Sequence, residues 1–264
     1  MNRVIRKPAA PRINRRKFIR WCIYGVPAAM LANTFWWEPE WLKTRRLNLA
    51  PRSTSHRLVH FSDLHYKGDR AFLKKVIKRI NALEPDLVCF TGDIIEDSKF
   101  LPEALELMQG VRAPMYGIPG NHDYWARADF DAVAEAFAAM GGKWLMDQET
   151  LTRDGKVNVI GVTCGKAPQF VARTGLKNIL MFHYPNWVEK LNGLSFDLML
   201  AGHSHGGQVR LPFFGALLVP FGVGQFEMGL YQTASGPLYV NPGIGYFYFN
   251  ARFCCRPEVT LIEI

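Results

Sequence analysis

The sequence predicts a mixed α/β (α+β) fold, a four-layer α-β-β-α sandwich of two mixed sheets. Three observations support this prediction. Between residues 57 and 140, short apolar runs alternate with helical patterns, which is typical of strands joined by crossover helices. From residue 157 onward, apolar runs continue with fewer helical patterns between them. Asp, Asn and His residues follow several runs directly, at the place where open α/β sheets put their active sites.

The first half of the folded region predicts three strand–helix pairs. The strands are expected at residues 58–61, 87–90 and 115–118, where the apolar runs are short and continuous. The helices are expected at residues 72–83, 101–108 and 130–138, where apolar residues recur at helical spacing.

The second half predicts five further strands, at residues 157–163, 179–182, 198–201, 238–240 and 259–262. Because few helical patterns separate them, two mixed sheets are favoured over one doubly wound sheet. The sequence shows no internal repeat.

The positive charge of the chain is concentrated near its N-terminus. The chain carries 32 Lys and Arg against 23 Asp and Glu, a formal net charge of +9. Residues 1–50 hold eleven of the basic residues and only two acids, so the rest of the chain is balanced. A nucleic-acid-binding domain needs its positive charge on the folded body, so a nuclease is disfavoured.

Residues 1–41 are predicted to be a basic leader with a single apolar anchor in a bacterial cell membrane. The seventeen residues from 21 to 37 are uncharged, and as a helix they would span about 25 Å, near the lower limit for a bilayer core. The run Asn14-Arg15-Arg16-Lys17-Phe18-Ile19-Arg20 resembles a twin-arginine export signal. The basic flank favours an extracytoplasmic, periplasmic position for the domain. The alternative is a basic amphipathic segment on the membrane surface.

Residues 42–56 are predicted to be a linker, and residues 57–264 a single domain. The five cysteines show no C-x-x-C spacing, which indicates free thiols rather than a zinc ribbon or a redox motif.

Five motifs place metal-binding types of side chain directly after predicted strands. They are Asp63 with His65, Asp93 after Gly92, Asn121 with His122 after Gly120, His183, and His203 with His205. A single histidine on an apolar run, such as His60, is interpreted as structural. Because the motifs follow neighbouring strands, we expect them to converge on one site.

Carboxylate, imidazole and amide groups in this combination fit a pair of divalent metal ions. Two ions about 3.5–4 Å apart can clamp a phosphoryl group and generate hydroxide near neutral pH. Asp93 is placed to bridge them with its two oxygens. The absence of cysteine from the motifs favours Mn, with Fe or Zn as alternatives, over a thiolate-bound structural zinc.

The motifs D-x-H, G-D, G-N-H-D, a single His after a strand, and G-H-x-H resemble the signature of the calcineurin-like metallophosphoesterase superfamily, from about residue 57 to the C-terminus. The resemblance implies a dinuclear metal site at the strand ends. It implies a first metal ion bound by Asp63, His65, Asp93 and His205, and a second bound by Asp93, Asn121, His183 and His203. It also implies that His122 is the catalytic histidine and that Asp123 orients it.

A narrower resemblance is to bacterial phosphodiesterases of the YaeI/YkuE type. It is carried by Asp197-Leu198-Met199-Leu200, by the run G-H-S-H-G-G-Q-V-R-L-P from Gly202, and by the ending Cys255-Arg256-Pro257-Glu258-Val259-Thr260. This resemblance implies a phosphodiesterase or pyrophosphatase, and some of the wider group cleave UDP-2,3-diacylglucosamine in lipid A synthesis. The alternatives are a phosphomonoesterase or protein phosphatase, and a metal-binding module without catalysis.

Two segments bear on the substrate. Residues 211–226 carry no charge, and residues 246–249 are all aromatic. Each is interpreted either as a loop that contacts lipid or as a segment folded into the core. Gln208 and Arg210 are candidates to contact phosphate oxygens, because arginine can bind them in a bidentate manner.

Overall fold

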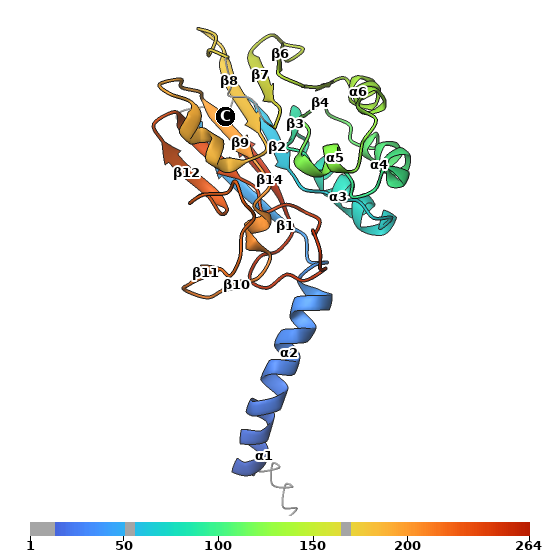
Figure 1. Ribbon diagram of the computed structural model, residues 1–264, viewed down its shortest axis with the longest axis vertical. Helices are drawn as coiled ribbons and strands as arrows, with labels where there is room; N and C mark the ends of the chain where they lie inside the picture. Colours follow the sequence, from blue (N-terminus) through green and yellow to red (C-terminus); the bar gives the residue numbers. More distant parts are fainter. Residues whose placement is uncertain (1–13, 51–55, 165–169) are drawn as a thin grey trace, which may run out of the picture.

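A computed structural model describes residues 14–50, 56–164 and 170–264 (Figure 1). The basic residues Arg3, Arg6, Lys7 and Arg12 of the predicted leader lie outside the described residues, as does the predicted linker segment 51–55. The predicted strands and helices are all present, with bounds that differ by at most two residues. The five cysteines are free, as predicted.

Two six-stranded mixed sheets form the body (Figure 1). The first sheet has the order β1 (Lys43–Asn48), β14 (Glu258–Glu263), β2 (Arg57–Phe61), β3 (Leu87–Phe90), β4 (Met115–Gly117) and β5 (Lys143–Trp144). The second has the order β12 (Gly229–Thr233), β13 (Gly236–Val240), β9 (Leu198–Ala201), β8 (Lys177–Phe182), β7 (Val157–Val162) and β6 (Gln148–Leu151). Strands β2, β3 and β4 are parallel, as are β7, β8, β9 and β13. A separate hairpin contains β10 (Arg210–Leu211) and β11 (Gly215–Ala216).

Side chains alternate between the two faces of each strand, and this alternation builds the apolar layers. Leu58 of β2 and Ile179 of β8 point into the layer between the sheets. Val59 points to the opposite face, which is covered by α3 (Arg70–Ala82), α4 (Leu101–Met108) and α6 (Phe130–Ala139). Leu180 of β8 faces an outer layer that contains the 3₁₀-helix η4 (Pro185–Lys190). The predicted sandwich of two mixed sheets is confirmed, and this fourth layer holds a 3₁₀-helix.

Helix α3 shows how the local sequence produces these elements. The side chain of Asp69 accepts a hydrogen bond of 2.9 Å from the backbone N–H of Phe72, which caps the start of the helix. Leu73, Val76 and Ile80 are buried at helical spacing and pack against the first sheet. Three short helices lie in loops near strand ends: η3 (Ser98–Phe100), α5 (Asn121–Trp125) and η5 (His205–Gly207).

The predicted linker at 42–56 is wrong for residues 43–48, because these form β1. This strand pairs in parallel with β14, and Lys43 lies opposite Glu258, with 2.9 Å between Nζ and Oε2. Leu47 is the single large apolar residue of the strand and packs against the layer between the sheets. A charged strand at a sheet edge has no apolar alternation, so its sequence resembles a linker.

An N-terminal stalk of four consecutive helical segments projects from the body (Figure 1). The segments are α1 (Arg15–Arg20), the π-helical turn η1 (Trp21–Gly25), α2 (Val26–Ala32) and the π-helical turn η2 (Asn33–Trp37). Among the described residues, no helix combines the length and the apolar character needed to cross a membrane. At the base of the stalk, the Thr34 carbonyl accepts a hydrogen bond of 2.9 Å from the backbone N–H of Arg252.

Candidate metal centre

The predicted metal-binding residues all follow strands at one edge of the two sheets. Asp63 and His65 follow β2, Asp93 follows β3, Asn121 begins α5 after β4, His183 follows β8, and His203 and His205 follow β9. The first sheet therefore supplies three motifs and the second sheet supplies two. The seven side chains are brought together where the carboxyl ends of strands from both sheets meet, as the sequence predicts.

Several of these residues lie in strained turns. Asp63, His65, Asp93, His203 and His205 have φ angles between 43° and 64°. Outside glycine, such conformations cost about 1–3 kcal/mol each and are concentrated at functional sites. The folded structure therefore holds each strand end in a conformation that the isolated segment would avoid.

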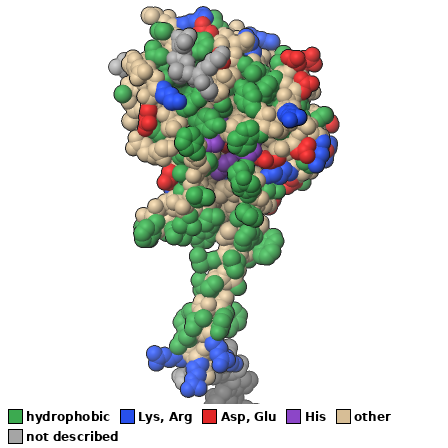
Figure 2. All heavy atoms as spheres, viewed as in Figure 1, with side chains coloured by type: hydrophobic (Ala, Val, Ile, Leu, Met, Phe, Trp, Pro, Cys, Tyr) green, Lys and Arg blue, Asp and Glu red, His purple; other side chains and the backbone are tan. Residues whose placement is uncertain are grey.

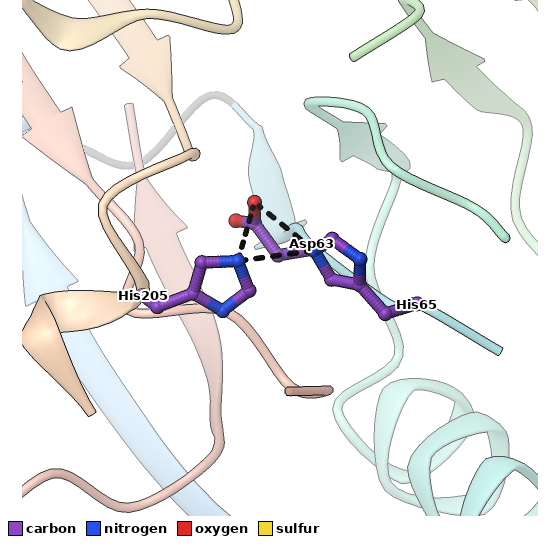
Figure 3. A group of neighbouring side chains, drawn as sticks. All are labelled: Asp63, His65 and His205. Atoms are coloured by element: carbon purple, nitrogen blue, oxygen red, sulfur yellow. Dashed lines mark hydrogen bonds and ion pairs between the residues drawn. The ribbon is translucent and has the colours of Figure 1, made fainter. Parts of the chain in front are cut away.

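One group of side chains contains Asp63, His65 and His205 (Figure 3). The Nε2 atoms of the two imidazoles lie 3.0 Å apart. The Oδ1 atom of Asp63 lies 3.7 Å from Nε2 of His205 and 4.0 Å from Nε2 of His65. The three side chains thus direct one nitrogen or oxygen each toward a common point.

A second group contains Asp93, Asn121, His183 and His203. Nε2 of His183 lies 3.0 Å from Oδ1 of Asn121, 3.2 Å from Oδ2 of Asp93 and 3.2 Å from Nδ1 of His203. Oδ2 of Asp93 also lies 3.5 Å from Nε2 of His65, so this oxygen stands between the two groups.

The donor atoms of both groups fit a pair of cations. Oδ2 of Asp93 is buried and makes no hydrogen bond to any described residue, whereas Oδ1 accepts the backbone N–H of His122 at 2.8 Å. A buried carboxylate oxygen without a hydrogen bond is costly unless a positive charge neutralises it. Its position beside imidazoles from both groups would allow two metal ions to share it.

Hydrogen bonds behind the imidazoles determine which ring nitrogen faces the centre. His183 donates from Nδ1 to the Thr91 carbonyl at 2.6 Å, and His203 donates from Nε2 to the Phe221 carbonyl at 2.7 Å. In the neutral form of each ring, the other nitrogen carries no hydrogen and faces the centre. This arrangement is the usual way in which proteins orient histidine ligands.

Glu96 is a residue of the centre that the sequence reasoning missed. Its carboxylate contacts Nδ1 of His65 and lies 2.9 Å from Nδ1 of His122, so it connects the two rings. Burial raises the pKa of Glu96, but its hydrogen bonds with His122 and His65 outweigh burial and lower that pKa to about 2. No motif marks Glu96 in the sequence; its position three residues after Asp93 is the only signal.

The predicted role of Asp123 is corrected by its contacts. Its carboxylate accepts the backbone N–H groups of Asp93, Ile94 and Gly120 at 2.7–2.9 Å. Asp123 therefore stabilises the turn that carries Asp93, and it is Glu96 that contacts the His122 ring. Burial, together with the charge of Asp93, raises the pKa of Asp123 to about 7.

Asp93 and His183 form a tightly coupled pair. Burial raises the pKa of Asp93, but the positive charge of His183, with smaller effects from His65 and His122, outweighs burial and holds that pKa well below its usual range. Burial lowers the pKa of His183, and Asp93 outweighs it and raises that pKa to about 9. Burial lowers the pKa of His203 to about 3, with a further contribution from His183. A cation that binds to His183 must therefore displace a proton from its ring.

Gln208 and Arg210, the candidates to contact phosphate oxygens, have hydrogen-bond and ion-pair partners within the chain. The Gln208 amide donates to the carbonyls of Phe249 and Ala251 at 3.0 Å and accepts the N–H of Phe247 at 3.3 Å. Arg210 pairs with Glu227 at 2.8 Å. Both side chains hold loops together, and these partners are distant in sequence, so spacing alone does not reveal them.

The two apolar segments are largely exposed beside the centre. Figure 2 shows histidines at the surface with hydrophobic side chains around them. Phe213, Phe214, Leu218 and Phe221 of the segment 211–226 are exposed, although Val223 and Phe226 are buried. The first eleven residues of this segment are therefore largely outside the core, whereas its end is folded into it. Residues 246–249 lie outside the strands, and the ring of Phe247 lies 4.6 Å from that of His122.

Comparisons with known proteins agree with this geometry. A sequence model of the calcineurin-like phosphoesterase family matches residues 56–207. The uncharacterized metallophosphoesterase YkuE of Bacillus subtilis is 29% identical over 285 residues, which cover 96% of this chain and 98% of that protein. The phosphodiesterase YaeI of Escherichia coli is 27% identical over 278 residues, with 96% and 99% covered.

A third relative and one solved structure complete the comparison. The UDP-2,3-diacylglucosamine pyrophosphatase LpxG of Chlamydia trachomatis is 27% identical over 297 residues, which cover 86% of this chain and 90% of that protein. One solved structure has a TM-score of 0.51 and 14% identity, and the alignment covers 71% of this chain and 90% of the chain in that structure. That likeness concerns the fold alone.

Proposed function

The chain belongs to the calcineurin-like phosphoesterase family and is a metal-dependent phosphoester hydrolase, and we propose that it acts as a phosphodiesterase or pyrophosphatase. Members of the family use a dinuclear divalent metal centre. One observation carries the proposal: the unpaired Oδ2 atom of Asp93 stands between two groups of converging ligands.

In this proposal, each group of side chains holds one ion. Asp63, His65 and His205 hold the first, Asn121, His183 and His203 hold the second, and Asp93 is shared by both. When bound, the two ions supply Lewis acidity toward the phosphoryl oxygens and a hydroxide near neutral pH. The mixture of carboxylate, amide and imidazole ligands favours Mn, with Fe or Zn as alternatives.

His122 is proposed as the catalytic residue of the chain itself. Its ring lies 4.7 Å from that of His65, and Glu96 holds its Nδ1 atom. The Nε2 atom is then the ring nitrogen that faces the substrate, where it hydrogen-bonds a phosphoryl oxygen or protonates the leaving oxygen.

The test uses the purified full-length protein with added Mn²⁺ and bis-p-nitrophenyl phosphate as a generic diester. We expect turnover that chelation or Asp93→Asn abolishes, whereas Asp97→Asn, an exposed carboxylate that caps η3, is the matched control and retains turnover. Unchanged turnover in Asp93→Asn or under chelation contradicts the proposal. Faster hydrolysis of p-nitrophenyl phosphate would indicate a phosphomonoesterase or protein phosphatase, and metal binding without hydrolysis would indicate a binding module.

The substrate is proposed to be lipid-linked, with UDP-2,3-diacylglucosamine as one example. The support is the name of the relative LpxG and the exposed apolar side chains beside the centre. Profiling the Mn²⁺-loaded enzyme against membrane lipid extracts tests this, and turnover restricted to water-soluble diesters would contradict it.

The stalk is proposed to attach the protein to the bacterial cell membrane. Its support is a set of exposed hydrophobic side chains that includes Trp21, Tyr24, Leu31 and Trp36, next to a basic end at Arg15–Arg20. We propose that the catalytic domain faces the extracytoplasmic side, whereas hydrolysis of a UDP-linked lipid would require the cytoplasmic side. A C-terminal alkaline phosphatase fusion distinguishes these, because it is active only outside the cytoplasm.

A further inference from the structure

An open cavity of about 370 Å³ lies beside the candidate metal centre. One wall of its lining is the loop 217–220, and a second is formed by residues 247–249 and Ala251. The remaining lining residues are Ser204, His205, Gly207, Gln208 and Val209. We call this cavity the apolar trough.

The apolar trough is continuous with the metal centre. His205 lines the trough and also belongs to the first group of metal-binding side chains. Phe247 lines the trough, and its ring lies 4.6 Å from that of His122 and 6.4 Å from that of His65. A substrate whose phosphate lies at the centre therefore has the trough directly beside it.

The lining of the trough offers almost nothing to a polar ligand. Nine of its thirteen residues are apolar or aromatic, and none is Lys, Arg, Asp or Glu. The Gln208 amide is already used in three hydrogen bonds to the wall 247–251, and the Ser204 hydroxyl accepts the N–H of Gly206. The polar groups left for a ligand are Nδ1 of His205 and the hydroxyls of Ser204 and Tyr248. A nucleobase or sugar placed here would therefore replace few of its hydrogen bonds to water, whereas a hydrocarbon chain would lose none.

The walls of the trough expose large hydrophobic side chains to water. Leu218, Tyr248 and Phe249 are 80%, 77% and 75% exposed. Phe213 and Phe214, in the neighbouring β10–β11 hairpin, are fully or nearly fully exposed. Figure 1 places this hairpin at the same end of the body as the stalk. Contiguous exposed apolar side chains of this kind mark binding surfaces rather than ordinary protein surface.

We infer that the apolar trough binds one hydrocarbon chain of an amphiphilic phosphodiester while the phosphate lies at the metal centre. This inference rests on the proposed function and specifies the substrate class of the same site. The hydrocarbon chain occupies the trough between Leu218 and Phe249. The rest of the bound substrate extends toward Trp125, whose ring lies 4.6 Å from that of His122. Selectivity therefore comes from the length of the chain and not from a polar contact.

The experiment compares p-nitrophenyl alkyl phosphates with ethyl and octyl chains, at concentrations where both are monomeric, using the full-length protein with Mn²⁺. Complete burial gives at most about fourfold per methylene, the equivalent of ~0.8 kcal/mol. Because the trough is open, we expect kcat/KM for the octyl ester to exceed that for the ethyl ester by about tenfold or more, mainly through a lower KM.

Variants of the trough and a nucleotide substrate test whether a preference for the octyl ester comes from the trough. Leu218→Asp and Phe249→Asp place a charge in the trough and should bring the octyl-to-ethyl ratio close to one. Val171→Asp, at a residue that is 68% exposed and does not line the trough, is the matched control and should keep the ratio. Equal kcat/KM for both chain lengths in the unaltered protein overturns the inference but not the proposed function, whereas the proposed function fails if neither ester is hydrolysed. A preference for the p-nitrophenyl ester of a nucleoside monophosphate over the octyl ester also overturns the inference.

Discussion

Oε1 of Glu96 lies 2.9 Å from Nδ1 of His122, and the same carboxylate contacts His65. One residue thus orients both the proposed catalytic ring and a proposed metal ligand. Glu96→Gln keeps the shape of the side chain but removes its charge, so both rings lose their electrostatic support. We expect kcat for a generic diester to fall by about 10–100-fold and Mn²⁺ affinity to fall with it.

Steady-state kinetics and a Mn²⁺ titration of the same samples measure both effects. Glu103→Gln is the matched control, because this nearby carboxylate contacts Tyr66 and Arg70 and neither histidine ring. Glu103→Gln should leave kcat and metal affinity unchanged. Equal activity in Glu96→Gln and the unaltered protein would show that Glu96 does not orient the rings.

Most of the metal centre could be predicted from the sequence because its geometry follows from chain direction. Asp63, Asp93 and His183 each come directly after an apolar run, and the carboxyl ends of parallel strands lie at one edge. Once the runs are identified as strands, the convergence of the motifs needs no further information. The central strands could be predicted because both of their faces are buried, which makes their apolar runs continuous.

What could not be predicted depends on contacts between distant segments. Edge strands such as β1 are half-exposed and charged, so they lack the apolar pattern of a buried strand. Glu227, the ion-pair partner of Arg210, lies in a later loop. Glu96 has no distinguishing neighbour, because its two histidine partners come from other strand ends. Each of these pairings forms only after the sheets have assembled.

His60 links the stability of the fold to pH. It lies fully buried on β2, its Nε2 atom donates to the Thr91 hydroxyl at 2.9 Å, and burial lowers its pKa to about 3. The folded state therefore keeps His60 neutral, whereas the unfolded chain binds a proton below pH ~6.5. The contribution of neutral His60 to the free energy of unfolding is complete above pH ~6.5 and is lost progressively as pH falls toward 3. Between pH 7 and pH 5 the loss amounts to about 2 kcal/mol.

Urea denaturation of the metal-free protein at pH 7 and pH 5 measures this loss. His60→Gln cannot bind a proton, so the variant should lose about 2 kcal/mol less stability than the unaltered protein over the same interval. Other histidines titrate in both proteins and cancel in the comparison. If both proteins lose the same stability, His60 does not stay neutral in the fold.

Arg252 is buried with a complete set of carbonyl partners. Its guanidinium donates to the carbonyls of Pro242, Gly243, Gly245 and Cys255 at 2.6–3.2 Å. Arg252→Met removes the donor from the carbonyls of Pro242, Gly245 and Cys255, whereas Gly243 keeps the N–H of Glu258, and we expect a loss of roughly 3 kcal/mol or more in the free energy of unfolding. Arg252→Lys, with three donors, should be intermediate. Arg256→Met removes a half-exposed guanidinium that lies over the Trp41 ring at 3.8 Å and donates to the Trp41 carbonyl at 2.8 Å, and it should cost only about 1–1.5 kcal/mol. Comparable losses in Arg252→Met and Arg256→Met would contradict this account.

Gly202 allows the second sheet to approach Asp63. A Cβ atom at Gly202 would lie 1.9 Å from Oγ of Ser62 and 2.6 Å from Oδ2 of Asp63, so Gly202→Ala must displace the Asp63 carboxylate. The backbone N–H of His203 donates to both Asp63 oxygens at 3.0 and 3.1 Å, so the same shift disturbs the next proposed ligand as well. We expect Mn²⁺ affinity to fall by at least about tenfold, since orienting contacts of metal ligands are worth 10–100-fold. Gly25→Ala is the control, because its Cβ would meet only a Trp21 ring atom at 3.9 Å within the stalk, far in sequence from every ligand. Isothermal titration with Mn²⁺ should separate the two variants, and equal affinities would show that close contact at Gly202 does not position Asp63.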